Sequence, residues 1–314
     1  MIKLADFLQM EHLIKSVSLM ITETLGMTNI SVISNLVQMK QFIKENMFEM
    51  CKKGLLDLLK LHLEDLKDKN PGDEDKYTLL HCAAEYGHLN IVEYLVPHLN
   101  YSNPRTAVNL HSKGADQETP LHLAAKKGHL HIIEFIVDLI NDINPANGYG
   151  WTVLHEAAYY GHLNVVTFYT AKLDNQNPGQ ITRKYVPRGR TTPLHFAALK
   201  GHLEVVKHLC GFLKNKNPSD EHGFTPLHVA AGNGHIDVVK YLVQFLKNKH
   251  PKSHYNTTPL NLAMRMRRTE VVIFLEQFLD TKLKHPKLEG PGSRKYETPF
   301  ENYENFCLKF KIKK

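Results

Sequence analysis

Apolar and polar positions along the chain recur with a period of about 33 residues. From Thr192 the sequence reads TPLHFAALKGHLEVV, and from Thr225 it reads TPLHVAAGNGHIDVV. In each copy a first stretch runs from TPLH to a GH pair, and a second stretch follows that is apolar at i, i+3 and i+4. This order predicts two short amphipathic helices per copy, because a helix with one buried face repeats its apolar residues every three or four positions.

Seven copies can be aligned in this way. The six clearest begin at Thr78, Thr119, Thr152, Thr192, Thr225 and Thr258. A further copy lies one period upstream, near residue 45, where Met47 and Gly54 fall in register. The copy at Thr258 keeps the register but has Asn261 in place of the histidine and Arg267 in place of the glycine.

Each recurring position has a physical role in a helix pair. Threonine suits a helix N-cap, because its hydroxyl accepts from backbone N–H groups that have no partner in the helix. Proline fits the first helical position. Paired alanines such as Ala124 and Ala125 let two helices approach closely, and a glycine such as Gly201 takes the left-handed conformation that ends the first helix. The second helix then buries Leu203, Val206 and Leu209.

A proline follows each second helix, as at Asn217-Pro218. It stops the helix and begins an extended finger. The distance from this proline to the next motif threonine is 7 residues in four copies but 15 and 14 in the other two. We therefore expect enlarged fingers at 105–118 and 179–191. Insertions of this kind often lie on the binding face of a repeat array.

These copies resemble the ankyrin-repeat family, whose 33-residue turn-helix-helix unit contains TPLHxA. The resemblance covers residues 42 to 280 and implies an all-α repeat solenoid, an ankyrin array of helix-turn-helix units joined by β-hairpin-like fingers. It also implies a monomeric array without enzymatic activity that binds a protein partner on its concave face, as an adaptor, scaffold or inhibitor. In the family, the TPLH histidine ties neighbouring units together by hydrogen bonds and the GH histidine lies at the start of the second helix.

The segments at the two ends differ from the array at 47–280. Residues 1–46 read as two amphipathic helices, which either cap the array or bind a partner. Residues 281–314 form a basic segment with nine Lys/Arg and four Glu, and Thr298-Pro299-Phe300 suggests a truncated repeat at 298–310.

Charge outside the C-terminal segment is nearly balanced. The chain carries +7, of which nine minus four, or +5, lies in 281–314, so the rest holds only +2. The usual footprint of a nucleic-acid-binding domain is therefore missing. One finger nevertheless gathers Arg183, Lys184, Arg188 and Arg190 with no carboxylate between them. It is either a solvated loop or, together with the C-terminal segment, a site for nucleic acid or another anionic surface.

Catalytic and metal-binding patterns are not found. Cys51, Cys82, Cys210 and Cys307 show no zinc-type spacing, and we expect no cofactor, no metal and no enzymatic activity. No apolar run is long enough to cross a membrane and the N-terminus does not read as a signal peptide, so we expect no membrane insertion and a cytoplasmic or nuclear protein. By resemblance, Asn217, Asn144 and Asn70 share the register at which some ankyrin asparagines are hydroxylated, although the proline that follows each departs from the usual pattern.

Candidate partner contacts follow from the family's variable positions, which are the finger residues before the motif threonine and the pair before GH. The resemblance maps them to Tyr77, Tyr86, Lys126, Lys127, Tyr149, Trp151, Tyr159, Tyr160, Lys200 and Phe224. The only tryptophan of the chain and three tyrosines fall in one copy, and these residue types are enriched at binding hot spots. We expect a hot spot centred on Trp151, Tyr159 and Tyr160, where Trp151→Ala weakens binding with little effect on melting. The alternative is that these aromatics pack against one another.

Overall fold

The computed structural model describes residues 47–63, 72, 77–98, 118–140, 142–173 and 191–278. The chain divides into two compact units, residues 1–67 and 68–314, and each is described by itself. The expectations for 1–46, for 281–314 with its truncated repeat at 298–310, and for most of the two enlarged fingers lie outside the described residues.

In the first unit, residues 47–52 are helical and α3 spans Leu56–Leu63. Gly54 lies between them with φ of 70°, a left-handed conformation that glycine adopts without steric cost. The buried side chains in this unit include Met47, Met50 and Leu59. They show the apolar spacing that the sequence predicts for a helix pair.

The second unit is built from helix pairs in which the first helix, here called helix A, begins directly after a motif threonine. The A helices are α4 (Leu79–Tyr86), α7 (Pro120–Lys127), α9 (Val153–Tyr160), α11 (Pro193–Lys200), α13 (Pro226–Asn233) and α15 (Pro259–Arg265). The second helices, called helix B, are α5 (Leu89–Leu95, continued by the 3-10 turn η1, Val96–His98), α8 (Leu130–Val137), α10 (Leu163–Lys172), α12 (Leu203–Phe212), α14 (Ile236–Phe245) and α16 (Thr269–Phe278).

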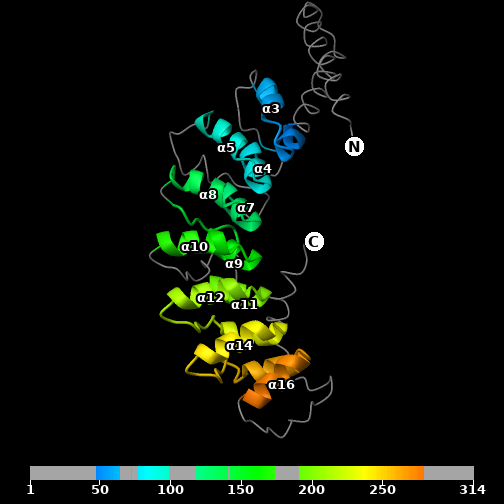
Figure 1. Ribbon diagram of the computed structural model, residues 1–314, viewed down its shortest axis with the longest axis vertical. Helices are drawn as coiled ribbons and strands as arrows, with labels where there is room; N and C mark the ends of the chain where they lie inside the picture. The colour runs from blue at the N-terminus through cyan, green and yellow to red at the C-terminus, as the bar shows by residue number, and fades with distance from the viewer. Residues whose placement is uncertain are drawn as a thin grey trace, which may run out of the picture. The chain divides into compact units, whose positions relative to one another are not determined.

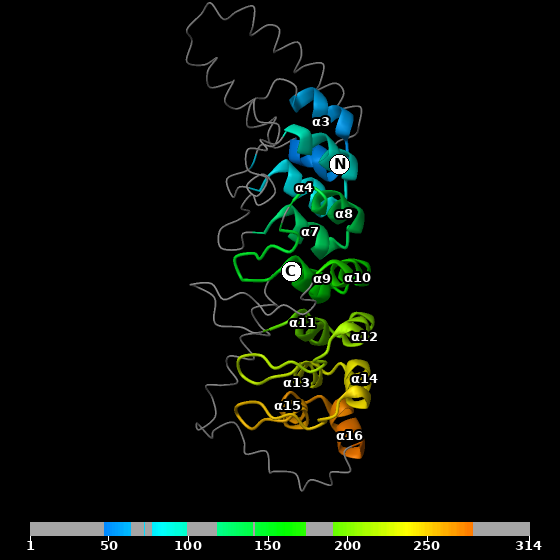
Figure 2. The same ribbon diagram turned by 90° about the vertical axis from the view of Figure 1, so that its left-hand side faces the viewer.

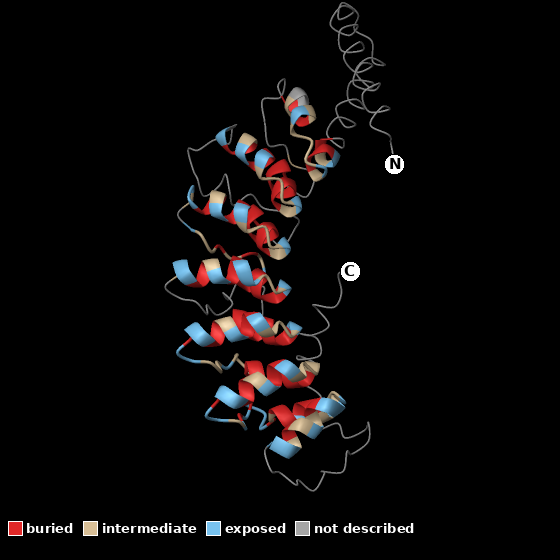
Figure 3. Cartoon of the chain, viewed as in Figure 1, coloured by how far each residue is buried: buried red, intermediate tan, exposed pale blue. Residues whose placement is uncertain are grey.

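The helices stack in two parallel rows (Figures 1 and 2). Each A helix packs against the A helices before and after it, and α10, α12, α14 and α16 do the same in the B row. Buried residues lie mainly along the sides where helices face each other (Figure 3). The paired alanines of α4, α7, α9, α11 and α13 are all buried, which fits the close approach that the sequence predicts. The all-α repeat solenoid is therefore confirmed, and the described residues contain no extended sheet.

The histidine of TPLH caps its own helix and binds the next copy. The backbone N–H of Thr192 donates to His195 Nδ1 at 3.2 Å, so the ring proton lies on Nε2. Nε2 then donates to the Phe224 carbonyl of the following copy at 3.1 Å. Equivalent bonds to the next copy are made by His122, His155 and His228. The structural role implied by the family resemblance is thus confirmed for these residues.

The histidine of GH bonds in the opposite direction along the stack. Each A helix from α4 to α13 ends in a left-handed glycine, such as Gly161 with φ of 82°. His202, which follows the next such glycine, donates from Nε2 to the Tyr159 carbonyl at 2.9 Å. His129, His162 and His235 make the same bond to the preceding A helix. These bonds satisfy carbonyls that a helix end leaves without partners.

The fingers have a hairpin-like geometry held by one polar side chain. In the finger before α9, Asn147 Oδ1 accepts from the backbone N–H groups of Tyr149 and Trp151, both at 3.0 Å. Asp220 and Ser253 accept at the same register in later copies. This side chain fixes the direction in which the residue before each motif threonine points.

Candidate protein-interaction site

The candidate contact residues occupy two positions of the repeat. Tyr86, Lys127, Tyr160 and Lys200 are the last residues of α4, α7, α9 and α11, and Lys126 and Tyr159 each lie one residue earlier. Tyr77, Trp151 and Phe224 directly precede a motif threonine, at the base of a finger, and Tyr149 lies in the turn of the finger before α9. Since the left-handed glycine and the histidine bonds fix each helix end, the repeat brings these side chains into one row along the A helices, called here the A-end row.

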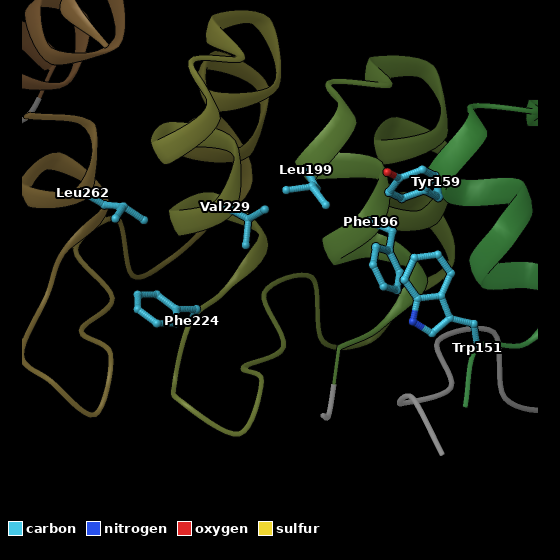
Figure 4. Packing of buried hydrophobic residues seen from close by; sticks show 7 residues of the cluster. All are labelled: Trp151, Tyr159, Phe196, Leu199, Phe224, Val229 and Leu262. Atoms are coloured by element: carbon cyan, nitrogen blue, oxygen red, sulfur yellow. The ribbon is translucent and has the colours of Figure 1, made fainter. Parts of the chain in front are cut away.

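Trp151, Tyr159 and Phe196 are neighbouring aromatic members of a buried cluster (Figure 4). The centroid of the Trp151 ring lies 4.3 Å from that of Phe196 and 5.5 Å from that of Tyr159. Tilted aromatic pairs at such distances attract beyond the effect of their burial. Only 6% of Trp151 and 7% of Tyr159 is exposed. The cluster joins the finger before α9 to α9 and α11.

The sequence predicts a hot spot centred on Trp151, Tyr159 and Tyr160, and the burial of Trp151 and Tyr159 favours the alternative for these two residues. Their rings pack against each other and against Phe196, which is the alternative that the sequence left open. Phe224, only 3% exposed, belongs to the same cluster of buried residues. Truncating Trp151 would therefore leave a cavity, and the expectation that Trp151→Ala has little effect on melting does not fit this packing.

The aromatic side chains that remain exposed on the A-end row are Tyr86 and Tyr160, with Tyr149 on the adjoining finger. The Tyr160 ring stands nearly perpendicular to that of Tyr159, at a centroid distance of 5.0 Å. Tyr160 is thus held on the buried cluster while much of its surface faces solvent. Burial of its inner part raises the pKa of Tyr160 to about 12, so its hydroxyl stays protonated and able to donate.

Lys126 is held between an acid and an aromatic ring. Its Nζ lies 3.4 Å from Glu118 Oε1 and 5.8 Å from the centroid of Tyr160. Burial by itself would lower the pKa of Lys126, but Glu118, Tyr160 and Glu156 raise it above its ordinary value. Lys126 therefore stays charged, and its contact with the Tyr160 ring links α7 to α9.

A second acid holds the neighbouring part of the row. The hydroxyl of Tyr77 donates to Glu85 Oε2 at 2.6 Å, and Lys127 Nζ lies 3.5 Å from Glu85 Oε1. Burial and this hydrogen bond raise the pKa of Tyr77. Tyr77 thus holds the Glu85 carboxylate in position. Lys127 is exposed at the end of α7.

Lys200 differs from the other two lysines. Its Nζ lies over the buried Tyr159 ring, 4.4 Å from the centroid. Within the described parts of the chain it forms no ion pair with a carboxylate. A lysine in this position offers a charge to a partner and already covers the aromatic cluster.

The structure places Tyr86, Lys126, Lys127, Tyr159, Tyr160 and Lys200 along one row of helix ends, and Trp151 packs against Tyr159. It places Phe224 further along the stack, before α13. The finger with Arg183, Lys184, Arg188 and Arg190 lies outside the described residues, so its role stays a prediction. Phe196 supports this row but is not among the expected contacts. Glu118 also supports it, and because it precedes Thr119 in the register of Trp151 it is one of the variable positions that the family resemblance indicates.

The described parts of the chain were compared with the requirements of a metal site, a membrane-spanning helix and a reactive cysteine. They hold no group of three His, Cys, Asp or Glu side chains placed to bind a metal ion. None of their helices is both long and apolar enough to cross a membrane. Cys51, Cys82 and Cys210 are buried and form no disulfide bond in the described residues, and burial raises the pKa of Cys210 to about 11, which leaves its thiol protonated at neutral pH.

Comparison with protein families agrees with this architecture. A family model described as ankyrin repeats (3 copies) matches residues 47–112, 99–178, 168–253 and 194–284, and so covers most of the chain. This chain belongs to the ankyrin repeat family. Ankyrin repeats are generally protein–protein interaction modules and are typically non-enzymatic. A search of curated proteins finds no significant match.

Proposed function

We propose that this ankyrin repeat protein is a non-enzymatic adaptor, scaffold or inhibitor that binds a protein partner on the A-end row. The observation that carries this is the arrangement around α9, where the exposed Tyr160 stands on a buried aromatic cluster between Lys126 and Lys200. An aromatic side chain that is already positioned loses little conformational freedom on binding. Tyrosine is also among the residues most enriched at hot spots.

The charges of the row indicate the chemistry of the partner. Glu118 and Glu85 lie beside Lys126 and Lys127, whereas Lys200 lies over a ring. A partner carboxylate near Lys200 would gain a charge-assisted contact without displacing an existing ion pair in the described residues. The proposal therefore favours a partner segment with an acidic residue next to an apolar or aromatic one.

Quantitative affinity capture tests the proposal. The wild-type chain, Tyr160→Ala and Lys200→Gln are immobilised in equal amounts, and captured proteins are compared by mass spectrometry. We expect at least one protein captured by the wild type to be reduced about tenfold or more by each variant, as for a hot-spot side chain. Direct titration of that purified protein then gives the dissociation constants.

Ile273→Ala serves as the control, because Ile273 is an exposed apolar residue on helix B of another copy. It should capture the same protein as the wild type. All variants are also compared by circular dichroism and thermal melting. Equal capture by the wild type, Tyr160→Ala and Lys200→Gln, with all three folded, would count against the A-end row as the binding site.

The compartment belongs to the same proposal. Cys51, Cys82 and Cys210 form no disulfide bond in the described residues, which supports a reducing environment, the cytoplasm or the nucleus. The array itself is proposed to act as a monomer.

A further inference from the structure

Exposed phenylalanines lie at the C-terminal ends of three B helices. They are therefore on the layer of B helices, whereas the A-end row lies on the A helices. The helices α12, α14 and α16 end at Phe212, Phe245 and Phe278, so this residue recurs every 33 positions. Phe212 is 54% exposed and Phe245 53% exposed, and Phe278 is exposed as well. The outer ends of α12 and α14 are pale blue in Figure 3. Exposed aromatics in a regular row are unlike the scattered apolar residues of an ordinary surface.

The three rings form a line because their helices are neighbours. The α12 helix packs on α14, and α14 packs on α16. Packed helices lie roughly 8–10 Å apart, so each ring is about that distance from the next. A line of this kind can meet a flat surface with all three rings at once.

Each ring is held in place by the residue one turn earlier in its helix. The ring centroids of His208 and Phe212 are 4.7 Å apart, those of Tyr241 and Phe245 4.6 Å, and those of Phe274 and Phe278 5.5 Å. These i, i+4 contacts fix the rings on the helix surface.

Lysines accompany the rings with the same period. The sequence FLKNK occurs at 212–216 and again at 245–249. The second lysine of each copy reaches the ring of the next one: Lys216 Nζ lies 6.0 Å from the Phe245 centroid, and Lys249 Nζ lies 4.7 Å from the Phe278 centroid. The first lysine of each copy, Lys214 or Lys247, is exposed. Cations and rings therefore occupy one surface, called here the Phe–Lys surface.

The segments that follow α12 and α14 are positive although the chain outside its C-terminal segment is nearly neutral. The stretches 205–218 and 238–254 contain seven lysines and no aspartate or glutamate. Of these seven, only Lys207 pairs with a carboxylate of the described residues, that of Glu204. The acids of the three helices are Glu204 and Asp237, in the first turns of α12 and α14, and Glu270 and Glu276 in α16.

We propose that the Phe–Lys surface docks this protein peripherally on a membrane leaflet that is rich in anionic lipid. Phe212, Phe245 and Phe278 would enter the boundary between headgroups and acyl chains, while the lysines beside them would meet lipid phosphates. Apolar side chains flanked by basic ones are the usual composition of surfaces that lie in the membrane interface. Juxtaposed lysines add attraction to the negative leaflet.

Single-stranded nucleic acid fits the same surface less well. Bases bind such sites by stacking on open aromatic faces. Here each ring already contacts an aromatic neighbour, and a lysine ammonium lies over Phe245 and over Phe278. Less ring face remains for a base, whereas insertion into lipid needs only the exposed edge and side of the ring.

Vesicle flotation with the full chain tests the proposal. The wild type is mixed with vesicles of phosphatidylcholine alone or with 30% phosphatidylserine, and the floated fraction is measured against lipid concentration. We expect binding to the phosphatidylserine vesicles only. Phe212→Ala combined with Phe245→Ala should weaken the partition about tenfold, and Lys216→Gln combined with Lys249→Gln should weaken it about tenfold or more.

Matched variants separate this surface from the basic C-terminal segment and from net charge. Tyr255→Ala removes an exposed aromatic ring outside the Phe–Lys surface, and Lys53→Gln combined with Lys60→Gln removes the same charge from the first unit. Both should bind as the wild type does. Circular dichroism and melting show that each variant is folded, which is expected because the altered phenylalanines are largely exposed.

Three outcomes would overturn the proposal. The first is no binding of the wild type to anionic vesicles. The second is binding that the phenylalanine variant leaves unchanged, which would mean attraction through net charge or the C-terminal segment. The third is binding to a labelled single-stranded RNA that both double variants abolish while vesicle binding persists, which would assign the surface to nucleic acid.

Discussion

Burial separates the aromatic side chains near the end of α9 into two kinds. Trp151 and Tyr159 are enclosed in the cluster with Phe196, while Tyr160 stands on that cluster with its ring largely open. The two kinds respond differently to truncation, because only an enclosed side chain leaves a cavity when it is removed.

Trp151→Ala should destabilise the protein by about 3–5 kcal/mol, the usual cost of removing a buried large aromatic side chain. Tyr160→Ala should cost about 1 kcal/mol or less, as for most exposed positions. Urea unfolding followed by circular dichroism measures both. A Trp151→Ala variant as stable as Tyr160→Ala would show that the ring contributes little to packing and would restore a direct role in binding.

At the scale of the helix, the left-handed position after helix A is occupied by glycine in all copies of the second unit but one. Five A helices of the second unit end in glycine, but after α15 the left-handed position is taken by Arg267, with φ of 55°. Arg268 replaces the histidine that follows and donates from Nε to the Gly232 carbonyl at 3.0 Å. The bond between helix ends is therefore kept with different chemistry, while the backbone strain of a non-glycine residue remains.

Opposite substitutions at this repeat position should have opposite effects. Arg267→Gly should stabilise the protein by about 0.5–1 kcal/mol, because relief of left-handed strain exceeds the added freedom of the unfolded chain. Gly161→Ala should destabilise it by about 1–3 kcal/mol, because φ is 82° and a Cβ would lie 2.5 Å from His202 Nδ1. Denaturant unfolding gives both values. Destabilisation by Arg267→Gly would contradict the explanation from strain.

The elements could be predicted from the sequence to a large extent. A threonine two residues before a leucine marks the start of every A helix in the second unit, and GH marks the end of each except α15, because capping and left-handed glycine are local requirements. The burial of Trp151 could not be predicted in this way, since it depends on Phe196 in the next copy. The residues of the Phe–Lys surface could be predicted, because FLKNK recurs in the sequence. Their exposure could not, because it follows only from the packing of the B helices.

At the scale of the whole second unit, two sets of bonds link successive copies in opposite directions. The TPLH histidines donate to carbonyls of the following copy, and the GH histidines donate to carbonyls of the preceding one. Arrays of this kind derive much of their stability from such interfaces between neighbours. Protonation of these rings therefore affects the stability of the interfaces between copies rather than that of one copy.

Acid should weaken the stack through His195 and His228. Burial lowers the pKa of each ring to about 4, from an ordinary value of 6.5. Between these values the unfolded chain binds protons that the folded chain does not, so the free energy of unfolding falls as pH decreases from 6.5 to 4. Each histidine contributes a slope of about 1.4 kcal/mol per pH unit in this window and none well above it. Urea unfolding at pH 7.5, 6.0 and 5.0 measures the slope.

The chain supplies its own control for this prediction. In the last copy Asn261 replaces the histidine and still caps the helix, since its Oδ1 accepts from the Thr258 backbone N–H at 3.2 Å. His228→Asn should therefore keep the cap but lose the bond to Thr257, which lowers stability at pH 7.5. The slope below pH 6.5 should also decrease by about 1.4 kcal/mol per unit, because one titrating group is gone. An unchanged slope in this variant would show that acid acts on the array through other groups.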